Sequence, residues 1–288
     1  MLSGFSKRRG VSEADKLQPG STSVLSVDGG HSAVDRSVVG SDSVSTAWGP
    51  VAGIFWAIGI FVGVQFVVAL LAFAALRAYG VDEGRIDTIL TSSVAAQFLY
   101  IFLIESVTVA GILLYVRHKK GTLAQLGLTR ISLRHIWLAL AGFAVYFIAY
   151  VVIASLASSL VPSLDTEQEQ DIGFDNAITT LQLLLTFCSL AVLPPLAEEI
   201  VFRGFMFGGL RRAWKFMPAA IVTSLLFAAG HLFGGYSDEP LLWIAALDTF
   251  VLSMVLCHLR EKSGSLWPSI FVHAIKNSLA FSVLFLLN

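Results

Sequence analysis

The chain has 288 residues, of which 56% are hydrophobic and 14% are charged, and its formal net charge is −1. Its mean hydropathy of +0.76 is too high for an ordinary soluble domain. The chain has no excess of basic residues, so its charge does not favour a nucleic-acid partner. The composition therefore predicts a multi-pass membrane protein embedded in the lipid bilayer.

Residues 1–47 differ in composition from the rest of the chain, because they are rich in Ser, Gly, Val and Asp and contain Phe5 as their single aromatic residue. A segment of this kind buries too little apolar surface to fold alone, so we expect a disordered cytoplasmic tail. Residues 48–288 should form the membrane-embedded domain.

Apolar stretches of about 20 residues follow the tail, and each is long enough to cross a hydrocarbon core of roughly 30 Å as a helix. They are residues 51–76, 92–116, 136–160, 177–196, 217–233, 241–258 and 266–287. We therefore expect an all-α fold, a polytopic transmembrane helical bundle of about seven spans. Cys188 and Cys257 both fall inside spans, so we expect no disulfide.

The connections between spans predict how the chain is oriented, because connections rich in Lys and Arg stay on the cytoplasmic side. Those after the second, fourth and sixth spans are rich in Lys and Arg, whereas those after the third and fifth carry only acidic charges. This alternation predicts an N-terminus inside the cell and a C-terminus outside. We separately expect the plasma membrane to be the protein's location.

The first polar motif, EEIVFR, begins at Glu198 and follows Pro194 and Pro195 at the end of the fourth span. The prolines should break or kink the helix and free carbonyl groups, which suggests a wet cavity nearby. Glu199 and Arg203 are four residues apart on one helix face and should neutralise each other, which leaves Glu198 as a free general base or metal ligand. Alternatively, the motif is an interfacial charge cluster at a helix end.

Two further motifs have the spacing of one helical turn. Phe227 and His231 share a face of the fifth span, and His273 and Asn277 share a face of the seventh. A single histidine inside a membrane can simply hydrogen-bond a neighbouring helix. Two bulky polar side chains on one face are harder to explain structurally, and an imidazole with an amide can polarise a carbonyl group.

Other charged residues also lie inside apolar spans, namely Glu105 in the second, Asp248 in the sixth and Lys276 in the seventh. Charges in hydrocarbon are costly and often mark functional sites. Lys276 could neutralise one of the two carboxylates, so we interpret these residues as structural contacts or cavity lining.

Together the three motifs resemble the CPBP family of intramembrane proteases, which includes CAAX prenyl endopeptidases and the bacteriocin-processing or self-immunity proteins also called Abi. The family pattern is Glu-Glu-x-x-x-Arg, then Phe-x-x-x-His, then His-x-x-x-Asn or Asp, each on its own helix. This chain matches every position in order from Glu198 to Asn277, and the resemblance covers about residues 180–280.

The resemblance implies that Glu198 is the catalytic carboxylate, and that His231 and His273 are either metal ligands or groups that activate water and stabilise the oxyanion. Asn277 would help to hold the oxyanion, and the neighbouring ion pair would support the site. Glu198, His231 and His273 with one open position would suit a catalytic zinc. In the metal-free alternative, Glu198 and His231 deprotonate water while His273 and Asn277 donate to the tetrahedral oxygen.

The leading hypothesis is an intramembrane endopeptidase that cleaves a membrane-associated or lipidated peptide or protein. The alternative is a non-catalytic immunity or regulatory protein that sequesters a peptide, although a pure binder has no need for the full set from Glu198 to Asn277. A third hypothesis is a transporter that uses acidic residues as proton relays, but transporters commonly have repeated halves and no internal repeat is evident. The sequence predicts no oligomeric state.

Overall fold

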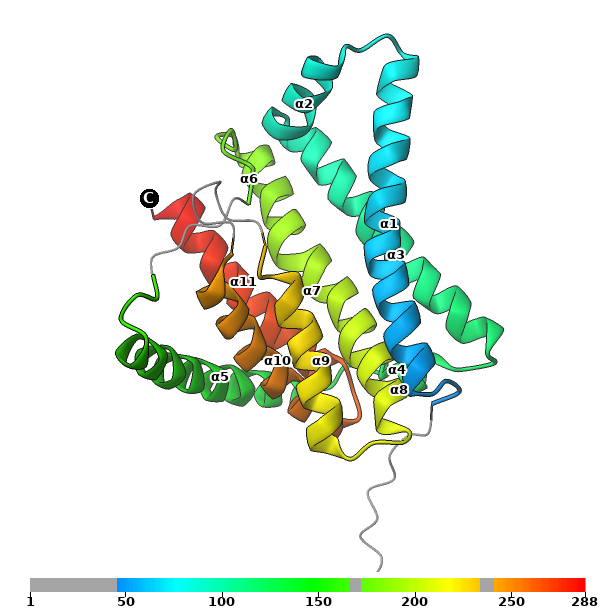
Figure 1. Ribbon diagram of the computed structural model, residues 1–288, viewed down its shortest axis with the longest axis vertical. Coiled ribbons are helices and arrows are strands. Elements are labelled where there is room, and N and C mark those ends of the chain that lie inside the picture. The colour runs from blue at the N-terminus through cyan, green and yellow to red at the C-terminus, as the bar shows by residue number, and fades with distance from the viewer. Residues whose placement is uncertain (1–45, 166–171, 234–240, 288) are drawn as a thin grey trace, which may run out of the picture. The chain divides into compact units, whose positions relative to one another are not determined.

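The computed structural model of the protein describes residues 46–165, 172–233 and 241–287 (Figure 1). These residues belong to one compact unit, residues 42–288. The predicted tail, residues 1–47, lies outside the described residues except at its end. There Thr46 is 3% exposed and its hydroxyl donates to the carbonyl groups of Trp48 and Gly208, so packed structure begins earlier than the sequence predicts.

The described residues are mostly helical and contain no β-strand, which confirms the all-α prediction. Within the described ranges, six helices are long and apolar enough to cross a membrane, and the shorter apolar helix α9 corresponds to the predicted fifth span. With η denoting π-helical segments, the elements are α1 Pro50–Ala78, α2 Glu83–Ser92, α3 Val94–His118, α4 Leu123–Leu126, α5 Leu133–Leu160, α6 Thr180–Phe187, η1 Cys188–Val192, α7 Leu193–Glu198, η2 Glu199–Met206, α8 Phe207–Arg211, α9 Phe216–Gly230, α10 Trp243–Ser263 and α11 Trp267–Leu286. The cytoplasmic placement of the N-terminus stays a prediction.

The fourth span is longer than the sequence predicts, because the elements from α6 to α8 join into one helix of 32 residues, Thr180–Arg211. This long helix begins at a capping box in which the Thr179 hydroxyl accepts from the Gln182 backbone N–H. Pro194 and Pro195 do not end it, because the turns before and after them adopt π-helical geometry. Glu198 therefore lies inside a helix rather than at its end.

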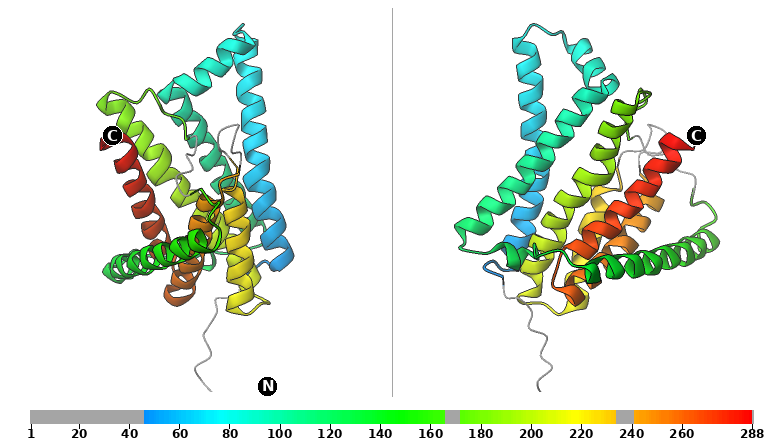
Figure 2. Two further views of the ribbon diagram at one scale, coloured as in Figure 1. Left: turned by 60° about the vertical axis from the view of Figure 1, so that its left-hand side comes forward. Right: turned by 180° about the vertical axis from the view of Figure 1, so that it is seen from behind.

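The long helix lies between two groups of helices, with α1 and α3 on one side and α9, α10 and α11 on the other (Figures 1 and 2). Helix α5 crosses α10 and α11 instead of running beside them, and Gly142 gives the close approach to Leu259 of α10 (Figure 2). Because α9 and α11 both contact the long helix, the three predicted motifs lie on neighbouring elements.

Trp48 anchors the start of α1 to the long helix. Its side chain is 2% exposed, its ring stacks on that of Phe205 with centroids 4.9 Å apart, and its indole N–H donates to the Phe205 carbonyl at 2.8 Å. Trp48→Phe is expected to lower the free energy of unfolding by about 1–3 kcal/mol, because it removes a buried hydrogen bond and part of a buried ring. Chemical denaturation in detergent measures this loss. Trp137→Phe on the exposed face of α5 is the control, and equal losses would contradict the anchoring role.

Candidate active site

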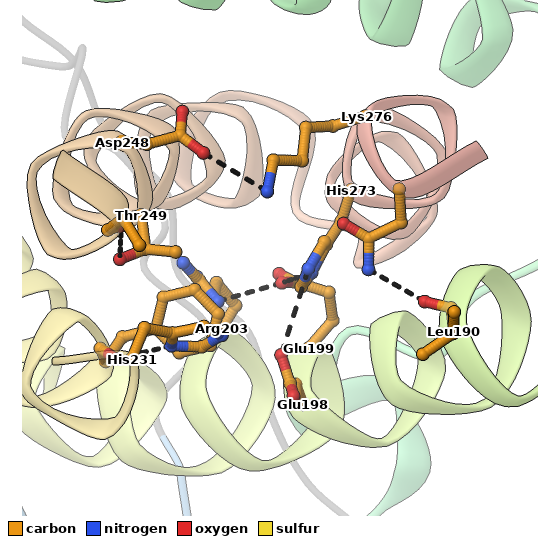
Figure 3. A network of polar contacts seen from close by, with 12 residues as sticks. Leu190, Glu198, Glu199, Arg203, His231, Asp248, Thr249, His273 and Lys276 are labelled. Carbon is orange, nitrogen blue, oxygen red and sulfur yellow. Dashed lines mark hydrogen bonds and ion pairs between the residues drawn. The ribbon is translucent and has the colours of Figure 1, made fainter. Parts of the chain in front are cut away.

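Glu199, Arg203 and His273 form a buried polar chain between the long helix and α11 (Figure 3). The ion pair expected from the spacing of Glu199 and Arg203 is present, with 2.8 Å between Oε1 and Nη1. His273 places its Nδ1 atom 3.0 Å from the same Glu199 oxygen. A carboxylate paired with arginine can only accept a hydrogen bond, so Nδ1 of His273 carries the proton, and in the neutral ring Nε2 keeps a lone pair.

Glu198 is the free carboxylate of the site. Its side chain is 12% exposed whereas that of Glu199 is 0% exposed, so Glu198 is the less buried of the two, although its Oε2 atom is itself covered. Its Oε2 atom lies 3.8 Å from Nε2 of His273 and has no hydrogen-bond partner in the described part of the chain. Two acceptors at this separation can both bind one water molecule at roughly 2.8 Å. The pair thus places a carboxylate oxygen beside an imidazole nitrogen, and the site must open slightly for a water molecule to bridge them, because Oε2 itself is buried.

Phe227 of α9 connects the second motif to this chain. Its ring centroid lies 4.3 Å from the guanidinium carbon of Arg203, a cation–π contact, and 4.7 and 5.9 Å from the ring centroids of His231 and His273. His231 follows the last residue of α9 and places Nδ1 3.0 Å from the Phe227 carbonyl oxygen. A carbonyl only accepts, so His231 also keeps its lone pair on Nε2. The structure therefore places Glu198 beside His273, and connects His231 to His273 through the Phe227 ring.

Asn277 is bound to the long helix. Its Nδ2 atom donates to the Leu190 carbonyl at 2.9 Å. The family resemblance implies that this amide donates to the oxyanion, but in the structure it already donates to the Leu190 carbonyl.

A second polar network beside the site links α5, α10 and α11. Lys276 Nζ lies 3.1 Å from Asp248, whose other carboxylate oxygen accepts from the Tyr146 hydroxyl. Of the two carboxylates that the sequence offers to Lys276, the structure thus selects Asp248. Glu105 instead has a buried carboxylate oxygen without a hydrogen-bond partner among the described residues. Tyr146 was not identified from the sequence. The only sequence feature that indicates it is its hydroxyl group, which needs an acceptor because it lies in an apolar span.

The donor set proposed for zinc is not assembled in this arrangement. A catalytic zinc needs three protein ligands around one point. Over residues 46–165, 172–233 and 241–287, no group of three His, Cys, Asp or Glu side chains is placed to hold a metal ion. Glu198, His231 and His273 therefore do not fit zinc as they lie here, and zinc stays a prediction that the family resemblance implies.

The fold and the site define a multi-pass helical membrane protein with a buried Glu-His-Arg cluster. Residues 180–279 match the family described as type II CAAX prenyl endopeptidase Rce1-like. This match includes every position from Glu198 to Asn277 and confirms the family resemblance seen in the three motifs.

Curated relatives are bacterial. The chain is 33% identical over 93 residues to an Escherichia coli protein called "Uncharacterized 24.3 kDa protein", covering 32% of this chain and 40% of that relative. It is 25% identical over 225 residues to the Bacillus subtilis protein named "Putative membrane peptidase YdiL", covering 78% of this chain and 86% of the relative. The UPF0177 protein YxdF of Lactococcus lactis is 26% identical over 138 residues, which is 48% of this chain and 70% of the relative. No solved structure matches.

Proposed function

We propose that this protein is an intramembrane endopeptidase that hydrolyses a peptide bond of a membrane-associated or lipidated peptide, with Glu198 as the general base. The observation that carries the proposal is the unbonded Glu198 oxygen 3.8 Å from Nε2 of His273. A carboxylate without a partner is costly in an apolar bundle, and function is the usual reason for such a residue. The endopeptidase family match and the peptidase name of the Bacillus subtilis relative support the same reaction.

The proposed reaction uses one water molecule held by Glu198 and His273. Glu198 takes a proton from the water as its oxygen attacks the carbonyl carbon of the scissile bond. The tetrahedral intermediate then collapses, the C–N bond breaks, and Glu198 returns the proton to the leaving amine. His273 orients the water through its Nε2 lone pair, because its Nδ1–H is held by Glu199, whose charge Arg203 balances.

A peptidase assay in liposomes tests this proposal. The probes are a quenched fluorescent peptide with a farnesylated cysteine near its C-terminus, chosen from the family's description, and a quenched single-span peptide. We expect cleavage of at least one probe, and slower cleavage of the same sequence without its lipid or its apolar span. Tight binding of the probes without any cleavage would instead support the sequestering alternative.

Metal content separates the two versions of the mechanism. Because three ligands are not assembled in the described residues, we expect cleavage to survive a chelator and the purified protein to hold no stoichiometric zinc. Elemental analysis of the wild type beside His231→Ala and His273→Ala measures this. One zinc per chain that both variants lose would contradict the metal-free version and establish the zinc site.

A further inference from the structure

The long helix contains a carbonyl group that its own backbone cannot bond. The Leu190 carbonyl would accept from residue 194 in an α-helix and from residue 195 in a π-helix. Both residues are prolines, which have no N–H group. The backbone is distorted just before them, with φ −119° and ψ −57° at Val192. A carbonyl without a donor inside a membrane span is costly, so its donor must come from another element.

Asn277 supplies that donor. Its Nδ2 atom lies 2.9 Å from the Leu190 oxygen, so the amide connects α11 to the long helix. Helix α11 packs against η1, the segment that contains Leu190. Asn277 lies one helical turn after His273, and Glu198 follows the prolines closely. The bond therefore joins the two helices next to the Glu198 and His273 pair.

We propose that Asn277 is a positioning residue: its amide replaces the N–H that Pro194 lacks, and it thereby holds His273 against Glu198 and Glu199. The oxyanion role that the family resemblance implies would make Asn277 necessary whatever residue occupies position 194. The positioning role makes it dispensable once residue 194 has an N–H group. This inference rests on the proposed function only for its effect on cleavage.

A double-mutant cycle between Asn277→Ala and Pro194→Ala distinguishes the two roles. Both kcat for the liposome probes and the midpoint of thermal unfolding are measured for the four proteins. We expect Asn277→Ala alone to lower kcat by roughly 10- to 100-fold and to lower the unfolding midpoint. In the Pro194→Ala background, Asn277→Ala should lower kcat by less than about threefold. Ser278→Ala, one residue further along α11, is the matched control and should change neither quantity.

Equal losses from Asn277→Ala in both backgrounds would overturn the proposal and support the oxyanion role. Thermal unfolding needs no substrate, so the unfolding midpoints of the four proteins test the hydrogen bond between Asn277 and Leu190 even if no probe is cleaved. Failure of this inference is thereby distinguished from failure of the proposed function. If Asn277→Ala alone does not fold, recovery of folding in the Pro194→Ala background supports the proposal, and persistent misfolding overturns it.

Discussion

Glu198→Gln is expected to lower kcat by roughly 10²- to 10⁴-fold while KM stays close to that of the wild type. Glutamine has nearly the same size and can still hold a water molecule, but it cannot take a proton from it. The fold should be unaffected, because Glu198 Oε2 makes no hydrogen bond within the described residues. Initial rates of probe cleavage in liposomes, measured over a range of probe concentrations, give both constants.

Glu261→Gln is the matched control for this substitution. Glu261 pairs with Arg211 at 2.6 Å on a partly exposed surface, with its side chain 30% exposed, so kcat should not change. Glu198→Gln should also bind the uncleaved probe as tightly as the wild type, which a fluorescence titration measures. Wild-type cleavage by Glu198→Gln would exclude Glu198 as the general base.

Arg203→Met is expected to lower the free energy of unfolding by about 3–5 kcal/mol, because it leaves Glu199 as a buried carboxylate without its cation. Both side chains of the pair are 0% exposed, so water cannot compensate for the loss. The double substitution Glu199→Gln with Arg203→Met should recover much of the lost stability, since no net charge then stays buried. Chemical denaturation in detergent measures all three proteins.

Arg211→Met provides the comparison for Arg203→Met, because it breaks an ion pair that is 17% and 30% exposed. Exposed pairs contribute little, so this variant should lose at most about 1 kcal/mol. Equal losses from Arg203→Met and Arg211→Met would show that burial does not distinguish the two pairs.

Contacts within one helix could be predicted from spacing alone. Glu199 and Arg203 are four residues apart, and that was sufficient to expect both their ion pair and a free Glu198. The predicted length of the fourth span was wrong, because the sequence places its end at residue 196, just after two prolines that should break or kink the helix, whereas the helix continues to Arg211. Proline does remove a backbone hydrogen bond, but a side chain from another helix can replace it, as Asn277 does here.

Contacts between helices depend on how helices pack, which spacing does not predict. Asn277 and Leu190 are 87 residues apart, and Trp48 and Phe205 are 157 apart. The approach of His273 to Glu198 depends in the same way on where α11 meets the long helix. Two adjacent prolines did indicate that a donor was needed, although not which residue would provide it.

The two π-helical segments decide where the long helix can change in length. A π-helical turn holds an extra residue compared with an α-helical turn, so Cys188–Val192 and Glu199–Met206 each carry a residue that an α-helix of the same phase would lack. Deleting one residue from either segment would return its wide turn to α-helical geometry and keep the rest of the helix in phase. Deleting one residue from an α-helical turn instead would rotate the remainder by about 100°. In α7, such a deletion would turn the Phe205 carbonyl away from Trp48. Single-residue deletions are therefore accommodated in the π-helical segments and not in the α-helical turns between them.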